Sequence, residues 1–441
     1  MTTFHLTDRA RGTLLVAVVT AAWLTLVANI AFHRPPWGDE RHYLETVRTF
    51  GRDLSAETLR TYPGELAPPL AFALYAGWGR LVGFEAPRLR LLSLVIAFAT
   101  VLAVHGLACR VLRDGRDAVL AALFFLVHPY TVGLSVFVFN DMTAILFAVV
   151  LAIGVAVARP TVVIVASAAG LMTRQYFAFL TAAAALYYLI RWTRQRRSSD
   201  LAALAGLAGS CLPLVAMFLL WGGLGPASAT RAHYLSAGLS FHPTALTLYV
   251  TQLFTFLWPL LLLHPSAWAR HTRGWWATVA GLSFAYWLAP IRPAPAQIVA
   301  GIDTIGLLHR AIRATVGRMG AAAEDVFFWI AFGLGVAVLL SLAGDIVSRR
   351  KDAWPDARAF LGFAVLSFLV VMPFSYLHWE KYFMPLLPLA AVLLLAMRED
   401  GRLKRDVRAR LGLTPASTSG RATSGGPRAA GSGARSPFAR R

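Results

Sequence analysis

The chain has few charged residues and almost no cysteine. Only 15% of its 441 residues are Asp, Glu, Lys or Arg, against roughly 25% in a soluble domain. Cys109 and Cys211 are the two cysteines, and both lie in or beside apolar runs. Two such residues give neither a disulfide framework nor a paired-cysteine metal or redox motif.

Two other signatures are missing from the sequence. There is no Gly-rich phosphate-binding motif ending in Gly-Lys-Ser/Thr, so ATP-driven work by this chain is not expected. No His/Cys/Asp spacing indicates a metal site. We therefore expect no metal and no organic cofactor.

Hydrophobic residues dominate what is present. They make up 57% of the chain, and the mean hydropathy is +0.59. Runs of about 20 apolar residues recur, each long enough to span roughly 30 Å of hydrocarbon. Strict alternation of apolar and polar residues, the mark of a membrane β-barrel, is absent. The first run, 12–31, lacks a small-residue cleavage site after it, so we expect a retained helix.

The formal net charge of +20 lies mainly in short segments between apolar runs and in the C-terminal tail. This pattern is typical of cytoplasmic loops and of contact with anionic lipid. A nucleic-acid-binding face is not expected, because no folded basic surface remains once the apolar runs are set aside.

The sequence predicts an all-α fold, a polytopic bundle of about twelve transmembrane helices with both termini in the cytoplasm. Residues 1–398 form the membrane module and 399–441 a basic tail, which is expected to be disordered from about 413 onward. The first outward loop, 33–87, is expected to carry interfacial amphipathic helices at 41–50 and 70–82. The expected spans are 12–31, 89–111, 118–127 with its continuation, 137–158, 161–172, 177–192, 201–221, 246–263, 275–289, 326–346, 360–373 and 382–397.

Polar residues from several loops gather on the outward side of this topology. Asp39 and Glu40 follow the first span directly, and ionisable groups near span ends usually face a cavity or a partner. Cations there suit an anionic substrate, and a carboxylate suits a base. The candidate catalytic residues are Asp39 and Glu40, and the candidate substrate-binding residues are His42, Asn140, Asp141, Arg174, Gln175, Arg231, His233, His378, Glu380 and Lys381.

Plainer interpretations of these residues stay open at this point. The acidic pair also fits the first turn of a helix, where the helix dipole favours negative charge. Arg174 also fits a lipid-facing anchor, whose long side chain reaches toward the headgroups. The remaining alternatives are a helix cap at Asn140-Asp141, an interfacial ion pair of Lys381 with Glu380, and hydrogen-bonded loop histidines at His233 and His378.

An ordered set of short motifs resembles a known family. The motifs are Gly38-Asp39-Glu40 with His42, Tyr62-Pro63-Gly64, His128-Pro129-Tyr130 with Asn140-Asp141, Gly170 to Gln175, Gly222-Gly223 with Arg231 and His233, His242-Pro243, and Glu380 to Pro385. Together they are similar to the GT-C glycosyltransferases, which use polyprenyl-phosphate sugars. Within that superfamily they most resemble the dolichyl-phosphate-glucose alpha-1,2-glucosyltransferases of lipid-linked oligosaccharide assembly. Lys381 stands where that family has Arg, which removes a two-pronged contact to phosphate.

The resemblance implies an enzyme of the bacterial plasma membrane with its active site on the non-cytoplasmic face. It implies transfer of a glucose-like hexose from a polyprenyl-phosphate sugar to a hydroxyl of a lipid-linked or cell-envelope glycan. The transfer is expected to invert the anomeric carbon, with Asp39 as general base and Glu40 orienting it or the acceptor. Arg174 and Lys381 are expected to stabilise the phosphate. The alternative from the residues alone is a transporter or flippase for a lipid-linked anion, and a third is a catalytically silent membrane scaffold.

Overall fold

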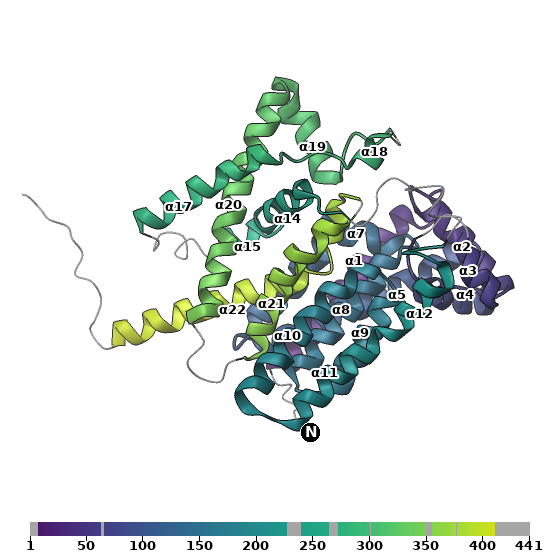
Figure 1. Cartoon of the computed structure of the whole chain (residues 1–441), viewed down its shortest axis with the longest axis horizontal. Coiled ribbons are helices and arrows are strands. Elements are labelled where there is room, and N and C mark those ends of the chain that lie inside the picture. Colours follow the sequence, from purple (N-terminus) through teal and green to yellow (C-terminus); the bar gives the residue numbers. More distant parts are fainter. Residues whose placement is uncertain are drawn as a thin grey trace, which may run out of the picture. The chain divides into compact units, whose positions relative to one another are not determined.

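The structure is a computed structural model that describes residues 8–62, 66–226, 240–263, 272–299, 301–348, 355–375 and 377–410. The chain divides into two units, Met1–Gly401 and Arg402–Arg441, and the first contains the residues discussed below. Every element in the described ranges is a helix (Figure 1), which confirms the all-α prediction there. The expected disordered tail lies outside the described residues from 411 onward.

Nine helices precede the segment that carries Arg174. They are α1 (Asp8–Ala31), α2 (Glu40–Arg52), α3 (Ala56–Thr61), α4 (Leu70–Val82), α5 (Ala86–Val111), α6 (Gly115–Val127), α7 (Pro129–Val136), α8 (Asn140–Ala156) and α9 (Pro160–Leu171).

The described elements that follow include five 3₁₀ helices, labelled η. They are η1 (Gln175–Phe177), α10 (Ala178–Gln195), α11 (Ser198–Ser210), α12 (Leu212–Trp221), α14 (Pro243–Thr255), α15 (Trp258–Leu262), α17 (Arg273–Ser283), η2 (Phe284–Leu288), α18 (Pro295–Val299), α19 (Leu307–Thr315), η3 (Val316–Met319), α20 (Ala321–Ser348), α21 (Ala357–Val371), η4 (Met372–Phe374), η5 (Glu380–Phe383) and α22 (Leu387–Arg410).

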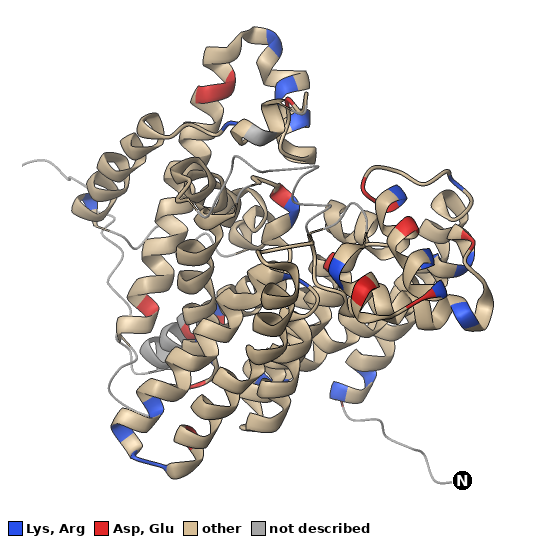
Figure 2. Cartoon of the chain, turned by 45° about the vertical axis from the view of Figure 1, so that its right-hand side comes forward, with Lys and Arg blue, Asp and Glu red and all other residues tan. Residues whose placement is uncertain are grey.

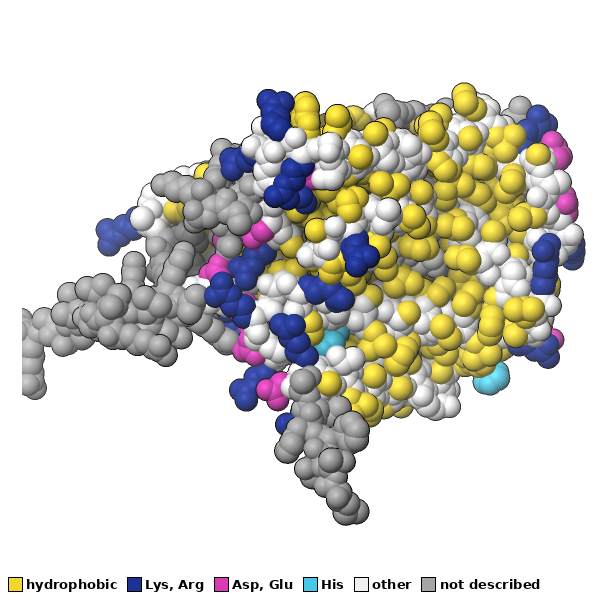
Figure 3. All heavy atoms as spheres, turned by 90° about the horizontal axis from the view of Figure 1, so that it is seen from below, with side chains coloured by type: hydrophobic (Ala, Val, Ile, Leu, Met, Phe, Trp, Pro, Cys, Tyr) yellow, Lys and Arg dark blue, Asp and Glu magenta, His cyan; other side chains and the backbone are white. Residues whose placement is uncertain are grey.

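The long helices are apolar in their middles and charged at their ends. Figure 2 shows Lys, Arg, Asp and Glu mainly at helix ends and in loops. On the face seen in Figure 3, a broad field of hydrophobic side chains lies between regions that carry most of the Lys and Arg. Many large apolar side chains are exposed, among them Leu219 at 78% and Val165 at 67%. Such an exposed apolar surface is what a lipid-facing bundle presents.

Five of the described helices are long and apolar enough to cross a membrane, or six if the bent pair α6 and α7 counts as one span. One expected span is bent instead. The run from 118 turns by 66° between α6 and α7, where Pro129 begins the second helix. The run from 201 has a turn at Cys211, just before Pro213, but it still counts as one of the five spans, Ser198–Trp221. A proline cannot donate to the preceding turn and favours a helix start. The count of about twelve spans stays a prediction.

The first outward loop forms its own packed layer. Tyr43, Leu44, Val47 and Phe50 of α2 are buried on one face, a helical spacing of apolar residues that favours packing against a neighbour. That neighbour is α4, whose bounds match the predicted amphipathic helix at 70–82. This layer places the start of α2, and with it Asp39, beside the ends of α5 and α8.

Candidate active site

Glu40 is held by a completely buried ion pair. Arg90 of α5 donates from Nε to Glu40 Oε1 at 2.9 Å and from Nη2 to Oε2 at 2.6 Å, and both side chains are 0% exposed. The same carboxylate accepts the backbone N–H groups of Val138 at 3.0 Å and Trp37 at 3.3 Å. Arg90 Nη1 also donates to three carbonyls within residues 31–34. Glu40 therefore ties the first loop to α5 and to the start of α8.

Asp39 differs from its neighbour in every one of these respects. It occupies the N-cap position of α2 without a side-chain bond to that helix. Its side chain is 52% exposed and accepts a hydrogen bond from Lys381 Nζ at 2.6 Å. The positive charge of Lys381 lowers the pKa of Asp39, and the charges of Arg174 and His42 act in the same direction. Asp39 is thus an ionised, accessible carboxylate at neutral pH.

Lys381 comes from the other end of the chain, on η5. Its side chain is 18% exposed, and Nζ lies 5.6 Å from the centroid of the Phe139 ring and 5.9 Å from that of Trp379. Burial disfavours the charged form, yet the negative charges of Asp39 and Asp141 raise the pKa of Lys381. Two aromatic faces and two carboxylates therefore keep this ammonium protonated.

A further ion pair, Arg174 with Asp141, lies near the pair of Asp39 and Lys381. Arg174, which precedes η1, donates from Nη2 to Asp141 Oδ2 at 3.0 Å and to the Tyr43 hydroxyl at 2.7 Å. Tyr176 donates its hydroxyl to Asp141 Oδ1 at 3.1 Å. Arg174 and Asp141 are buried, so the pair is protected from solvent. Arg174 is an internal residue here, and the lipid-facing anchor interpretation does not describe it.

The two pairs act on each other electrostatically. Arg174 contributes to lowering the pKa of Asp39, and Asp141 contributes to raising that of Lys381. Four residues from the first loop, from α8, from the start of η1 and from η5 are thus brought into one cluster. Each of its two cations is paired with a carboxylate, Lys381 with Asp39 and Arg174 with Asp141.

Glu380 is buried and fastens a distant loop. Its carboxylate accepts the Tyr130 hydroxyl at 2.7 Å, the Leu308 N–H at 2.8 Å and the His309 N–H at 2.7 Å. Gly306 lies so close to this carboxylate that an added Cβ would collide with it and with the Tyr130 hydroxyl. Burial raises the pKa of Glu380 against these hydrogen bonds. Glu380 does not pair with Lys381, so the predicted alternative of an ion pair between these two neighbours is wrong.

The other candidates lie around the cluster in different settings. His378 is buried with Nδ1 3.3 Å from the Arg292 carbonyl oxygen, and burial lowers its pKa to about 4. Asn140 is 1% exposed, and its carboxamide makes no hydrogen bond to the described part of the chain. Gln175 donates to the carbonyls of Leu66 and Leu224. His42 is exposed beside Asp39. Two candidates lie outside the described residues, namely Arg231 and His233.

The sequence analysis missed the partners that hold these groups, namely Arg90, Tyr43 and Tyr176. Arg90 carried a usable signal, because an arginine at the start of a long apolar run usually has a buried partner. The two tyrosines gave no such signal. Among the residues that the structure describes, no group of three or more His, Cys, Asp or Glu could hold a metal ion.

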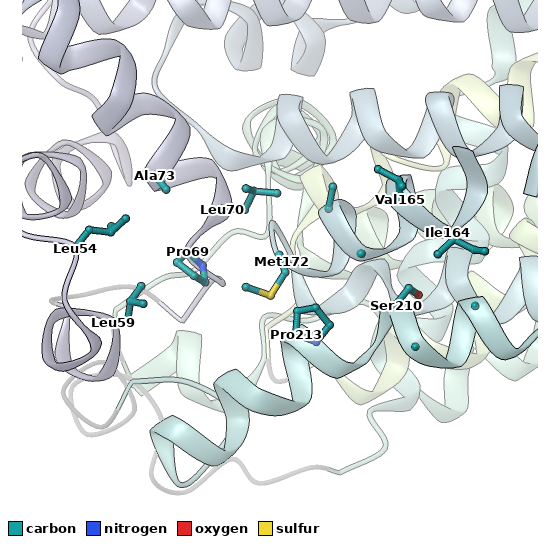
Figure 4. Close-up of a pocket in the computed structure, with 14 residues that line it drawn as sticks. Leu54, Leu59, Pro69, Leu70, Ala73, Ile164, Val165, Met172, Ser210 and Pro213 are labelled. Carbon is teal, nitrogen blue, oxygen red and sulfur yellow. The ribbon is translucent and has the colours of Figure 1, made fainter. Parts of the chain in front are cut away.

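A separate feature is an apolar groove, whose lining residues are drawn in Figure 4. It has a volume of about 640 Å³. Its wall includes Met172, whose carbonyl accepts the N–H of Leu70 at 3.0 Å and which precedes Arg174 by two positions. The groove runs between α4, α9, α11 and α12, and its lining is almost entirely aliphatic. The lining residues are Leu54, Leu59, Pro69, Leu70, Ala73, Ile164, Val165, Ala168, Ala169, Met172, Gly206, Gly209, Ser210 and Pro213.

Comparison with known proteins gives matches to solved structures alone. No family model matches the chain, and no curated protein does. The yeast (S. cerevisiae) protein O-mannosyltransferase Pmt1–Pmt2 complex, bound to its sugar donor, is similar at 18% identity over 55% of this chain and 38% of that one, with a TM-score of 0.39.

Two further structures match over most of this chain. The Archaeoglobus fulgidus oligosaccharyltransferase AglB, in complex with an inhibitory peptide and a dolichol-phosphate, is 14% identical over 91% of this chain and 52% of its own, with a TM-score of 0.44. ArnT from Cupriavidus metallidurans in the apo state is 15% identical over 91% of this chain and 80% of its own, with a TM-score of 0.43. This chain thus spans less than two thirds of the mannosyltransferase and AglB chains. With TM-scores below 0.5, the function has to be argued from the site.

Proposed function

We propose that the chain is a membrane glycosyltransferase that moves a hexose from a polyprenyl-phosphate sugar to an acceptor hydroxyl at the non-cytoplasmic face. One observation carries the proposal: an ionised, half-exposed carboxylate bonds to Lys381 and feels the charge of Arg174, which follows the groove residue Met172 by two positions. The cations suit the phosphate, the groove suits the lipid, and the carboxylate suits the base.

The reaction needs one base and little acid. Asp39 removes the proton from the acceptor hydroxyl, whose oxygen forms a bond to the anomeric carbon from the face opposite the leaving group. The bond from that carbon to the phosphate oxygen breaks, and the lipid phosphate leaves with the electron pair. Attack from the opposite face inverts the anomeric carbon. A carboxylate with a lowered pKa is ionised and ready, although a weaker base than one with a pKa near 7.

Lys381 and Arg174 stabilise the negative charge that develops on the leaving phosphate. A preorganised donor aimed at such charge contributes roughly 3–4 kcal/mol to the barrier. Lys381 supplies a mobile point charge, whereas Arg174 supplies a fixed charge held by Asp141 and Tyr43. Glu40 is a positioning residue: through Arg90 and Val138 it fixes the backbone that carries Asp39.

The groove accommodates the polyprenyl chain. The donor's chain comes from the bilayer, which is itself apolar, so the groove contributes by close packing around the isoprenoid and not by removing CH₂ groups from water. Met172 lines the groove and precedes Arg174 by two positions, which supports a lipid chain in the groove with its phosphate toward Arg174.

The direct test is a transfer assay with the purified full chain in lipid nanodiscs. Polyprenyl-phosphate hexoses, each labelled in the sugar, are offered with a lipid-linked glycan extract, and label in the glycan is counted. Label should move with at least one hexose and fall to background without the protein. Binding of the donor without any transfer, together with its movement between leaflets of a vesicle, would replace the enzyme with a flippase.

A further inference from the structure

The proposed roles of Asp39 and Lys381 conflict with the hydrogen bond between their side chains. Asp39 is assigned to the acceptor proton and Lys381 to the donor phosphate, yet the two side chains bond to each other at 2.6 Å. In the described part of the chain no other hydrogen-bond partner is found for either side-chain group. A carboxylate whose oxygen already accepts from an ammonium is a poorer base, and the ammonium is not free for phosphate.

We propose that the Lys381–Asp39 ion pair is a resting lock on the base, which the phosphate of the lipid donor opens by drawing Lys381 Nζ to itself. The inference rests on the proposed function and adds a binding order: donor first, acceptor deprotonation second. No proton moves in the unlocking step, because Lys381 stays protonated and exchanges one oxyanion partner for another.

The side chains of Asp39 and Lys381 can change partners, whereas those of the adjacent Glu40 and Glu380 cannot. The backbone on either side is fixed: Glu40 is clamped by Arg90, and Glu380 is clamped by Tyr130 and two backbone N–H groups. The side chains of Asp39 and Lys381 are therefore the movable parts. Asp39 is 52% exposed, so water can solvate its carboxylate when Lys381 leaves.

The surroundings also favour return of the lock once the product leaves. Lys381 faces the carboxylates of Asp39 and Asp141, the guanidinium of Arg174 and the rings of Phe139 and Trp379. Asp141 is already engaged by Arg174. With no phosphate present, Asp39 is the carboxylate left for Lys381, and the base is covered again. The carboxylate of Asp39 is thus covered whenever no donor phosphate is bound.

The test is a binding experiment in which a mutation of the base improves affinity. The probe is a sugar-free polyprenyl monophosphate, titrated into the full chain in phosphatidylcholine nanodiscs. Asp39→Asn releases Lys381, so the probe should bind about fivefold more tightly, the equivalent of roughly 1 kcal/mol. Glu57→Gln is the matched control, an exposed carboxylate on α3 paired with Arg60, and it should leave affinity unchanged. A second arm with inorganic phosphate separates recognition of the headgroup from that of the lipid.

A double-mutant cycle decides whether Lys381 carries the gain. In a Lys381→Met background, Asp39→Asn should add nothing. A gain in affinity that persists in the Lys381→Met background would come from removing a negative charge and not from releasing Lys381, and it would contradict the lock. Unchanged or weaker probe binding by Asp39→Asn alone would contradict it too. Asp39→Ser serves the same purpose if the amide variant does not fold. If the wild-type protein transfers sugar but Asp39→Asn binds the probe no more tightly, the proposed function stands and the lock is contradicted. If the wild-type protein does not bind the probe, both proposals are contradicted.

Discussion

Asp39 and Glu40 are neighbours in sequence and opposites in setting. Glu40 is 0% exposed and takes two hydrogen bonds from a guanidinium that is also 0% exposed, whereas Asp39 is 52% exposed and takes one from the ammonium of Lys381. A buried bidentate pair cannot lose one member without leaving an unpaired charge, while a half-exposed pair exchanges partners readily. Burial, more than residue type, thus separates the holding carboxylate from the reactive one.

The same arrangement recurs at the other end of the chain. Glu380 is 1% exposed and fixed by three hydrogen bonds, and its neighbour Lys381 presents a charge toward Asp39. In both dipeptides a buried glutamate holds the backbone and the adjacent residue faces the site. We infer that this pairing of an anchor with a reactive neighbour is how two distant segments reach a common point with so few charges.

The largest expected effect is on turnover. Asp39→Asn removes the base and should lower the rate of sugar transfer about 100- to 10,000-fold. Its effect on the free energy of unfolding should stay under about 1 kcal/mol, because the lost ion pair is half exposed. The rate is measured by label transfer in nanodiscs. Turnover near the wild-type value would contradict the assignment of Asp39 as base.

The next effect is on stability. Glu40→Ala leaves the Arg90 guanidinium buried without its carboxylate and should cost about 3–5 kcal/mol of unfolding free energy. Unfolding is followed by denaturant titration in mixed micelles. Glu57→Ala is the control on an exposed glutamate, with an expected cost below about 1 kcal/mol. Equal stabilities of the two variants would show that the buried pair does not hold the loop.

A substitution that fills the groove should have a smaller effect, limited to the KM for the lipid donor. Gly209 lines the groove and has open space where a Cβ would lie, so the side chain of Gly209→Leu extends into the cavity. We expect the KM for a long-chain polyprenyl donor to rise about tenfold, because the added side chain takes space that the lipid would fill. A water-soluble short-chain donor should be unaffected. Gly281→Leu is the matched control, since Gly281 is equally open but lies on α17. A rise for both donors would place the lipid elsewhere.

The smallest effect is a shift in pH dependence. Asp39 is faced by Lys381, Arg174 and His42, and Lys381 contributes most to lowering its pKa. Removing that cation in Lys381→Met makes protonation easier, so the pKa of Asp39 should rise toward its ordinary value. The acidic limb of kcat/KM for the donor, which reports the free enzyme, should then move to higher pH. Lys381→Arg should keep the limb in place, and a limb that does not move in Lys381→Met would contradict the pairing.

Much of the fold could be predicted from hydrophobic runs, although their breaks could not. The helix at 70–82 has the bounds that its amphipathic pattern predicts. Pro129 and Pro213 each lack an N–H for the preceding turn, yet the chain bends by 66° at the first and continues as one span through the second. Local sequence thus indicates where a helix starts, and tertiary contacts determine its direction.

The site could be proposed residue by residue, but its pairing could not. Asp39 and Lys381 are separated by 342 positions and Glu40 and Arg90 by 50, and nothing local shows which acid meets which base. The sequence analysis assigned the base to Asp39 and an orienting role to Glu40, but it could not predict which of the two is buried, because that depends on Arg90 in a helix beyond the first loop. Long-range packing therefore supplies the distinction on which the mechanism depends.

The most direct measurement compares the two isosteric amides, Asp39→Asn and Glu40→Gln, by transfer rate per folded molecule, with folded molecules counted by binding of polyprenyl monophosphate. Our account predicts that Glu40→Gln, though less stable, keeps at least about tenfold more activity per folded molecule than Asp39→Asn, because a positioning residue contributes less to the barrier than the base itself. The reverse order, an active Asp39→Asn beside an inactive Glu40→Gln, would contradict it.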